Sequence, residues 1–388
     1  MPAIYLDNAA STRPAAEVIG LVAEIAGAHF ANPSSAHAAG AAAARHLGQA
    51  RLQLAAALRV DADELVFTGG GTEANALGIL GAASRARGRH AVVTAIEHPS
   101  VLRTVERLAR EGGFRLTVIP VRSDGVVAPA EVAAAVTAET AVVAVMLVNN
   151  ELGTVQPIAE IAQAIGRALP GTPPGRRPHL HVDAVQALGF VPFRPATLGA
   201  DSLAVSGHKV HGPKGTGALW IRPGARLAPL WEGGGQERGL RSGTENLPGI
   251  VGFARAAGLA VQAAAEGAAD RMAALRDGFE AAAQAAVPGL QPTVTGGARA
   301  PHISSLRLPG LPAEPLLHAL DARGVIASAG SACASKSQGP SHVLKAVGIA
   351  DDDAVLRFSL SRDTTADELQ QAAVALAAAV AEIRGVAR

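Results

Sequence analysis

The chain has 388 residues, a length that suits one large domain with a smaller one beside it. About half of the residues are apolar (49%), few are charged (17%), and the formal net charge is only +1. This balance indicates a well-packed globular protein and argues against nucleic-acid binding or a membrane-surface role. A single cysteine excludes an intrachain disulfide and any multi-thiolate metal site, and we expect no metal site.

No targeting or membrane-spanning segment is apparent. The N-terminus MPAIYLDNAAS lacks the charged region and long apolar region of a signal peptide. We found no candidate membrane span of about 18 uncharged apolar residues outside alanine-rich helical patterns. We therefore expect a cytoplasmic protein without a membrane segment.

Apolar strand-like runs alternate with helical patterns, which is typical of an α/β fold with a mostly parallel sheet. Between the strands we expect helices that include 74–87, 100–111 and 158–168. Because the carboxyl ends of parallel strands meet at one edge of a sheet, we expect a site where polar or glycine-rich tips follow the strands. The expected strands are 64–68, 90–95, 115–121, 141–148, 179–184, 201–206 and 217–222.

The pattern changes after Pro248. An alanine-rich, proline-free segment to about Val287 predicts one long connecting helix. Strands within HISSLRLP, GVIASAG and VLRFSLS, and a final helix from residue 366, predict a smaller α+β domain. We expect a large domain over 15–255 and a small domain made of 1–14 and 256–388. The proline-rich stretch 172–178 is expected to be an exposed loop.

The segment SGHKVHGPKG (206–215) places a lysine just past a buried strand. Lys209 lies between hydroxyl and imidazole donors, an arrangement that suits a Schiff base with a phosphorylated aldehyde cofactor, with Ser206 and His208 holding the phosphate. The alternative is an ordinary solvated lysine in a turn. The glycine-rich turn GGGTEA (69–74) opens a helix, and its N–H groups suit phosphate, although a plain strand-to-helix turn has the same sequence features.

Two further polar residues follow predicted strands. Asp183, in HVDAVQ, could pair with a protonated pyridine nitrogen or could cap a helix. His98, in EHPS, could stack on a flat cofactor ring or move a proton, or it could simply begin a helix before Pro99.

Taken together, these motifs carry a family resemblance. The order GGGTEA, EHPS, NNELGTVQPI, HVDAVQ, SGHKVHGPKG, GGGQERGLRSGTEN and GSACAS resembles the class V aminotransferase superfamily of pyridoxal-phosphate enzymes, and more closely a cysteine desulfurase of the NifS/IscS type. The resemblance runs from YLDNAAST to LRFSLSRDTT. It implies the fold type I of pyridoxal-phosphate enzymes, with a seven-stranded, mostly parallel sheet and a smaller α+β domain.

The resemblance also implies a role for each matching residue. Lys209 matches the lysine that binds the cofactor covalently, and Gln186 matches the donor to its phenolic oxygen. His98 matches the ring-stacking residue and Asp183 the partner of the pyridine nitrogen. Residues matching the phosphate site are Gly71, Thr72, Ser206 and His208, with Thr244 of the partner subunit of a homodimer. Residues matching the substrate-carboxylate site are Asn149 and Arg357.

Cys333 lies among small residues in SAGSACASKSQGPSHVL, and we expect a mobile loop over about 328–341. In the family that this chain resembles, the matching cysteine takes sulfur from L-cysteine as a persulfide and alanine is released. The persulfide then serves an acceptor such as an iron–sulfur scaffold or a tRNA-thiolation protein. Either Lys209 or His98 could remove the substrate's α-proton.

Two alternative functions remain open, and the sequence departs from the pattern of its relatives at two positions. A selenocysteine lyase-like enzyme would use the same chemistry, and a non-catalytic scaffold-binding relative would keep only the fold. The chain has SGHK where relatives commonly have SAHK, and Gly339 stands where they often have an acidic residue.

Overall fold

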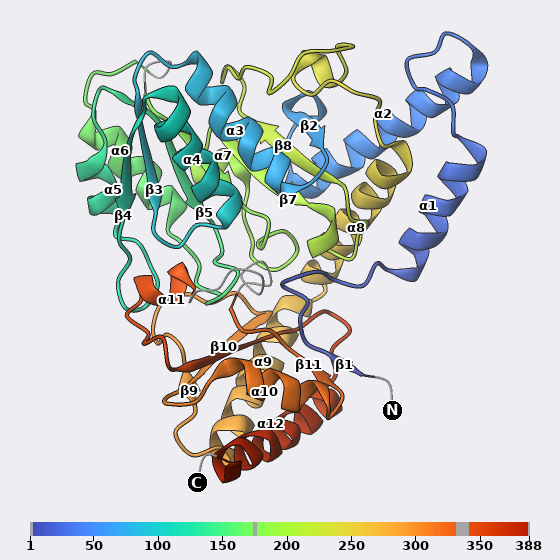
Figure 1. Cartoon of the computed structure of the whole chain (residues 1–388). Helices are drawn as coiled ribbons and strands as arrows, with labels where there is room; N and C mark the ends of the chain where they lie inside the picture. Colours follow the sequence, from blue (N-terminus) through green and yellow to red (C-terminus); the bar gives the residue numbers. More distant parts are fainter. Residues whose placement is uncertain (1–2, 174–176, 331–340, 387–388) are drawn as a thin grey trace.

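The computed structural model describes residues 3–173, 177–330 and 341–386 (Figure 1). Its centre is a seven-stranded sheet in which β8 runs antiparallel to both of its neighbours and the other pairs are parallel. In spatial order the strands are β2 (Leu65–Thr68), β8 (Gly217–Ile221), β7 (Ser202–Ser206), β6 (His179–Asp183), β5 (Thr140–Met146), β3 (His90–Thr94) and β4 (Arg115–Ile119).

These strands are the seven that the sequence predicts, so the expected mostly parallel sheet is confirmed. The ends differ by a few residues for local reasons. For example, β4 ends at Ile119 because Pro120 has no backbone N–H to offer a neighbouring strand. Glu64, expected in the first strand, instead closes a short 3₁₀ turn, η1 (Ala62–Glu64).

The sheet is surrounded by helices, including α3 (Gly71–Arg85), α4 (Pro99–Gly112), α5 (Pro129–Ala135), α6 (Ile158–Ala168) and α7 (Pro195–Leu198). The helix predicted over 74–87 begins three residues earlier, at Gly71. Two further helices that were not among the predicted elements, α1 (Ala16–Ala28) and α2 (Ala38–Leu58), lie to one side of the sheet and pack against α8 (Leu247–Ala265) (Figure 1).

The single connecting helix predicted up to about Val287 is wrong. The segment forms two helices, α8 and α9 (Ala268–Ala286), with Gly267 between them at φ 83°. That left-handed backbone angle ends a helix, and glycine adopts it at little cost. By length and composition alone α8 could cross a membrane, yet 56% of its apolar stretch is buried, as expected of a core helix.

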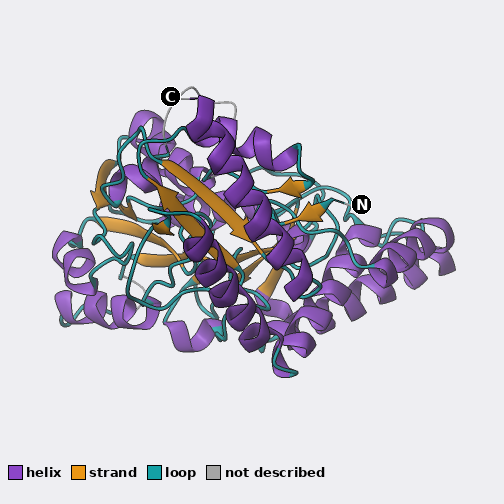
Figure 2. Ribbon diagram, turned by 90° about the horizontal axis from the view of Figure 1, so that it is seen from below, coloured by secondary structure: helices purple, strands orange, loops and turns teal. Residues whose placement is uncertain are grey.

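The C-terminal part forms a smaller layer below the main sheet in Figure 1, and Figure 2 views the molecule from that side. Strand β10 (Ile303–Leu308) pairs antiparallel with β12 (Ala354–Ser359) and β9 (Gln291–Pro292), while β1 (Ile4–Tyr5) pairs with β11 (Val325–Ile326). The helices here are α9, α10 (Ala313–Asp321), α11 (His342–Ala346) and α12 (Ala366–Val386), the last in agreement with the predicted final helix.

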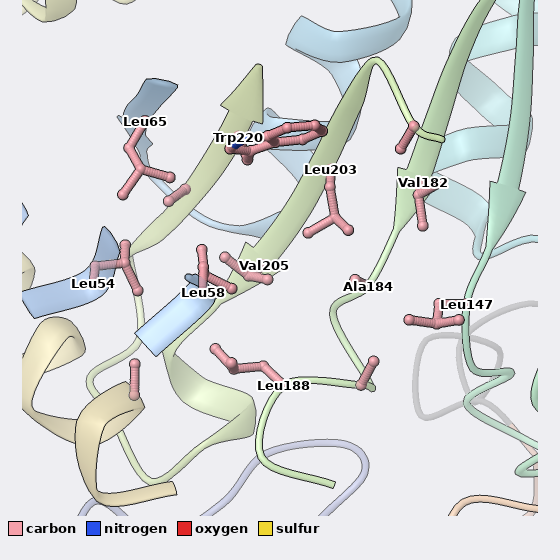
Figure 3. Packing of buried hydrophobic residues seen from close by; sticks show 14 of the residues in the cluster. Leu54, Leu58, Leu65, Leu147, Val182, Ala184, Leu188, Leu203, Val205 and Trp220 are labelled. Atoms are coloured by element: carbon pink, nitrogen blue, oxygen red, sulfur yellow. The ribbon is translucent and has the colours of Figure 1, made fainter. Parts of the chain in front are cut away.

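Two large hydrophobic clusters occupy the two parts of the molecule, but the predicted boundary at residue 255 falls inside α8, whose Ala256, Ala257 and Ala260 belong to the first cluster. One fills the space between the main sheet and its helices, where Leu54, Leu203 and Trp220 pack together (Figure 3). The other joins Leu6 from the N-terminus to Phe358 and the α12 side chains. Aromatic residues are scarce, so these cores depend on leucine, valine and alanine, at about 1.5–3 kcal/mol for each large aliphatic side chain buried.

Candidate active site

A cavity of about 210 Å³ opens at the carboxyl ends of β6 and β7, beside the start of α3. It lies at the edge where the sequence predicts a site. Of the twelve predicted site residues, the nine that line this cavity are Gly71, Thr72, His98, Asp183, Gln186, Ser206, His208, Lys209 and Arg357.

Lys209 reaches the cavity from the 3₁₀ turn η3 (Gly207–Lys209), which directly follows β7. Its Nζ donates to the backbone oxygens of Ala9 (2.7 Å) and Ala10 (2.9 Å). The N-terminal segment thus crosses the site, where the amide N–H of Ala9 is itself held by the Ser359 hydroxyl at 2.8 Å. Lys209 is therefore not an ordinary solvated turn lysine.

His208, beside Lys209, faces the same cavity as a neutral imidazole. Burial, reinforced by the Lys209 charge, lowers the pKa of His208 to about 4. Ser206 contributes a hydroxyl that lies 3.4 Å from the Thr216 backbone oxygen. Both side chains are thus able to donate hydrogen bonds into the cavity at neutral pH.

The start of α3 presents bare backbone to the cavity at Gly71. A Cβ on Gly71 would lie 2.7 Å from Val185 Cγ2, so only glycine fits here without displacing a neighbour. The first N–H groups of a helix have no partner within the helix, and together with the helix dipole they attract an anion. The glycine-rich turn therefore has the geometry of a phosphate site.

His98 begins helix α4, as one of the two interpretations expects, and it also lines the cavity. It is the N-cap of α4, where its Nδ1 accepts from the Ser100 backbone N–H at 3.0 Å, and its ring also lines the cavity. The Ser100 hydroxyl lies 2.8 Å from the same nitrogen. Burial, the largest cause, lowers the pKa of His98 below its ordinary value.

Asp183 ends β6 with its carboxylate in the cavity wall. Oδ2 accepts from Asn75 Nδ2 at 2.7 Å and Oδ1 accepts from the Val185 backbone N–H at 3.0 Å. The helix-cap alternative for Asp183 is wrong, because in the described stretch after residue 183 the chain makes turns until α7 begins at Pro195.

Gln186 lies in the following turn with its amide oriented by two neighbours. Its Nε2 donates to the Ala9 backbone oxygen at 2.8 Å, and its Oε1 lies 3.2 Å from His302 Nε2. His302, which the sequence analysis missed, stacks on Phe190 and is neutral because burial lowers its pKa to about 3. With Oε1 held by His302, the amide nitrogen of Gln186 can donate toward the cavity.

Arg357 enters the cavity from β12 and is 1% exposed. Its Nη1 donates to the Asn150 backbone oxygen at 2.8 Å and its Nη2 to Asp7 Oδ1 at 2.7 Å. Among the residues that the structure describes, Arg357 Nε has no hydrogen-bond partner although it is buried. A buried guanidinium N–H without a partner is unfavourable, and because Arg357 lines the cavity, its guanidinium is a candidate partner for an anionic ligand.

Asn149 does not line the cavity. Its Nδ2 donates to the Ile96 backbone oxygen at 2.9 Å, and its Oδ1 accepts from the N–H groups of Glu151 and Leu152. Its amide therefore shapes the turn after β5, while the neighbouring Asn150 is the one that faces the cavity. A direct contact between Asn149 and a substrate carboxylate is not indicated by this arrangement.

Two predicted site residues are elsewhere. Thr244 is exposed and does not line this cavity. Cys333 lies outside the described residues. The described residues flanking its segment attach close to the cavity: Ser328 pairs with the Arg357 backbone, and the Ser341 hydroxyl donates to Glu151 Oε2 at 2.6 Å.

Comparisons with known proteins agree with this geometry. The family model for aminotransferase class V matches residues 4–372. A cysteine desulfurase of Nostoc sp. strain PCC 7120 is 39% identical over 96% of this chain and 91% of its own length, and the cysteine desulfurase IscS of Methanosarcina thermophila is 38% identical over 95% and 90%.

Solved structures show the same likeness. A NifS-like protein superposes with a TM-score of 0.89 at 33% identity, covering 98% of this chain and all of that chain. The NifS-like protein of Rickettsia africae superposes with a TM-score of 0.84 at 28% identity, covering 99% of both. The chain belongs to the class V aminotransferase family.

Proposed function

We propose that this chain is a pyridoxal-phosphate-dependent cysteine desulfurase, which converts L-cysteine to L-alanine and transfers the sulfur to Cys333. The observation that carries the proposal is the convergence of Lys209, Asp183 and Arg357 on one cavity, from η3 after β7, from β6 and from β12. The relatives named cysteine desulfurase, which match nearly the whole chain, support it.

The lining residues fit pyridoxal phosphate. The Gly71 backbone, which has no room for a Cβ, and the donors Ser206 and His208 suit the phosphate, and Lys209 suits the aldehyde carbon. Asp183 offers an acceptor for the ring nitrogen, Gln186 a donor for the phenolic oxygen and His98 a flat ring face. When bound, the cofactor supplies an electron sink that weakens the bonds at the substrate's α-carbon.

Arg357 binds the substrate carboxylate. Its planar guanidinium suits a carboxylate in a two-point arrangement, and its Nε has no partner among the described residues. The contacts to Asp7 and the Asn150 oxygen hold the guanidinium in place before substrate arrives. We place the substrate carboxylate here and leave Asn149 a role in shaping the adjacent turn.

Lys209 takes the α-proton, and Cys333 takes the sulfur. The Cys333 thiolate forms a new S–S bond to the substrate sulfur as the substrate's C–S bond breaks. The electron pair of that bond stays with the three-carbon product, which gains a proton and leaves as alanine. The enzyme works as a homodimer in which Thr244 of the partner subunit completes the phosphate site, and an acceptor such as an iron–sulfur scaffold removes the sulfur.

Alanine and sulfide released from L-cysteine under reducing conditions test this function, with wild type compared with Cys333→Ser. Cys333 is the only cysteine, so no other thiol of the chain can accept sulfur. We expect equal amounts of both products from wild type, loss in Cys333→Ser with cofactor still bound, and normal release in the control Ser335→Ala. Equal turnover in Cys333→Ser, above all with L-selenocysteine, would instead indicate a lyase that releases the chalcogen directly.

A further inference from the structure

A row of polar side chains extends from the cavity into the interior of the sheet. Ser202 Oγ lies 2.7 Å from His179 Nε2 and 2.8 Å from His181 Nδ1, and His181 Nε2 lies 2.9 Å from Asn75 Oδ1. His181 and Ser202 are fully buried and Asn75 is 1% exposed. We call the row His179, Ser202, His181 and Asn75 the donor chain.

Asp183 sets the direction of every hydrogen bond in the donor chain. Both oxygens of Asp183 accept hydrogen bonds, Oδ1 from the Val185 N–H and Oδ2 from the Asn75 NH₂ group at 2.7 Å, so the Asn75 carbonyl faces His181. His181 must then donate from Nε2 and accept at Nδ1 from the Ser202 hydroxyl. The ring is neutral, in keeping with burial lowering its pKa to about 3.

The second N–H of Asn75 directs another group of the cavity wall. It donates to Ser100 Oγ at 3.0 Å, and the hydroxyl proton of Ser100 therefore points to His98 Nδ1, 2.8 Å away. The Ser100 backbone N–H donates to the same nitrogen. Because two donors point at Nδ1, the imidazole proton of His98 lies on Nε2.

Helix α3 packs closely against His181 and Ser202. A Cβ at Gly78, one turn after Asn75, would lie 2.4 Å from His181 Nδ1 and 3.0 Å from Ser202 Oγ. The helix can therefore approach the imidazole only because residue 78 has no side chain. Close packing of this kind holds Asn75 and His181 in one relative position.

We propose that Asn75 is a positioning residue that sets the proton arrangement of the site, holding Asp183 as an acceptor and His98 as a neutral ring that donates through Nε2. Proton removal then falls to Lys209, because His98 has no nitrogen available to accept. Lys209 Nζ takes the proton from the substrate's Cα, and a bound cofactor would supply the electron sink for the pair that the C–H bond leaves behind. This role rests on the proposed function; the hydrogen-bond directions do not.

Charged and titratable groups from several elements surround His98. Asp183 at the end of β6 favours the protonated ring, whereas Lys209 on η3 and His342 on α11 disfavour it, and His208 also lies close enough to interact. Burial is the largest influence and lowers the pKa of His98. All of these groups remain in a variant changed only at Asn75.

The test uses the holoenzyme with ¹⁵N-labelled histidine and the isosteric variant Asn75→Asp. NMR distinguishes protonated from unprotonated ring nitrogens, and His98→Gln identifies the His98 signals. In wild type we expect Nε2 protonated and Nδ1 unprotonated from pH 6 to 9. In Asn75→Asp the Ser100 hydroxyl turns toward the new carboxylate. The added negative charge favours the protonated ring, so the imidazole turns away from the Ser100 backbone N–H and Nδ1 gains a proton near pH 6.

Either of two NMR results would overturn the inference: a protonated Nδ1 in wild type, or an unchanged His98 pattern in Asn75→Asp. Variants of His181 separate positioning from packing. His181→Gln keeps a donor for Asn75 and should retain the wild-type pattern, whereas His181→Phe should shift it toward that of Asn75→Asp. Identical His98 patterns in His181→Gln and His181→Phe would mean that the donor chain contributes packing only and does not orient the Asn75 amide.

Exchange of the α-hydrogen of L-alanine into D₂O supplies a kinetic readout that does not need Cys333. We expect His98→Gln to lose less than ~10-fold, well below the ~10²–10⁴-fold expected for a missing base. A loss in His98→Gln as large as in Lys209→Ala would overturn the assignment.

The two proposals fail in different ways. A wild-type enzyme that exchanges alanine but releases no sulfur from L-cysteine contradicts the proposed function and leaves the proton arrangement intact. A wild-type enzyme that desulfurates L-cysteine with a protonated His98 Nδ1 contradicts the inference alone.

Discussion

Two walls of the same cavity differ in how completely their polar atoms are paired. On the wall built from the main sheet and its helices, hydrogen bonds of 2.7–3.0 Å link Asp183 to Asn75, Asn75 to Ser100, and Ser100 to His98. On the wall built from β12, Arg357 is equally buried, yet its Nε has no partner among the described residues. The polar atoms named on the first wall are all hydrogen-bonded, whereas Arg357 on the second wall keeps one unpaired N–H among the described residues.

This difference indicates which polar groups of the site are held in position before a ligand binds. Leaving a buried polar group unpaired costs about 1–3 kcal/mol, and more for a charged group. A carboxylate that pairs with Arg357 removes that penalty, so the β12 wall is suited to a substrate that comes and goes. The fully paired wall is suited to a cofactor that stays.

Lys209 lies between the two walls, and its loss has the largest expected effect. We expect Lys209→Ala to reduce alanine formation by at least ~10²–10⁴-fold, since it removes the proposed base. The control is Lys214→Ala, five residues away and exposed, which should leave the rate unchanged. Similar rates in Lys209→Ala and wild type would contradict the assignment.

Arg357→Lys tests the wall with the unpaired donor. Lysine keeps the charge but has neither an Nε nor a planar fork, and a hydrogen bond to a charged group is worth about 1.5–3 kcal/mol. We therefore expect kcat/KM for L-cysteine to fall ~10–100-fold, mostly through KM, with the cofactor's absorbance unchanged. Arg307→Lys on the adjacent strand, where Arg307 pairs with Asp353, is the matched control and should not change KM.

Gly71→Ala tests the cofactor end of the paired wall. Its Cβ would meet Val185 Cγ2 at 2.7 Å, and overpacking of this kind costs about 1–3 kcal/mol. We expect cofactor affinity to fall about tenfold or more, measured by titration of the apo protein. Gly48→Ala on α2, where a Cβ meets nothing within 4 Å, should bind the cofactor as wild type does; equal losses in both would point to a general effect on stability.

The buried histidine behind this wall, His181, makes the stability of the protein depend on pH. Burial holds His181 neutral with a pKa of about 3, below the ordinary value of 6.5, so its contribution is fully present above pH 6.5 and is lost as pH falls toward 3. Each such group contributes about 1.4 kcal/mol per pH unit in that window. Urea unfolding of the apo protein between pH 7 and 5 should show a shallower pH dependence in His181→Gln.

Glu97 contributes to the pH dependence of unfolding stability with the opposite sign. Burial raises the pKa of its carboxyl to about 8, so its contribution is present below pH 4.5 and is lost as pH rises toward 8. Glu97→Gln should therefore make the protein lose stability more steeply on acidification. The same slope in wild type, His181→Gln and Glu97→Gln would contradict this account of the buried groups.

Much of the fold could be predicted from the sequence, because strands and helices carry local patterns. All seven strands of the main sheet were found from their apolar runs, and the polar tips at Asp183 and Lys209 indicated the correct edge. The helix break at Gly267 also had a local signal, since a glycine past the last helical turn commonly ends a helix. The alanine-rich sequence on both sides of Gly267 makes that signal hard to recognise.

The remaining features depend on distant pairings that no local pattern carries. Asn75 is 108 residues from Asp183 and 106 from His181, so its place between them appears only when α3 packs on β6. Its position directly after the glycine-rich motif GGGTEA was the available hint. Asn149 and Asn150 could not be told apart either, because adjacent residues of a turn point in different directions.

Borohydride reduction of the holoenzyme, followed by peptide mass spectrometry, tests most directly whether this cavity is a pyridoxal-phosphate site. Reduction fixes the cofactor to the amine that it occupies. We predict one pyridoxyl group per chain, on Lys209, and none in Lys209→Ala. A group on another lysine, or none on an enzyme that still forms alanine from L-cysteine, would contradict the account.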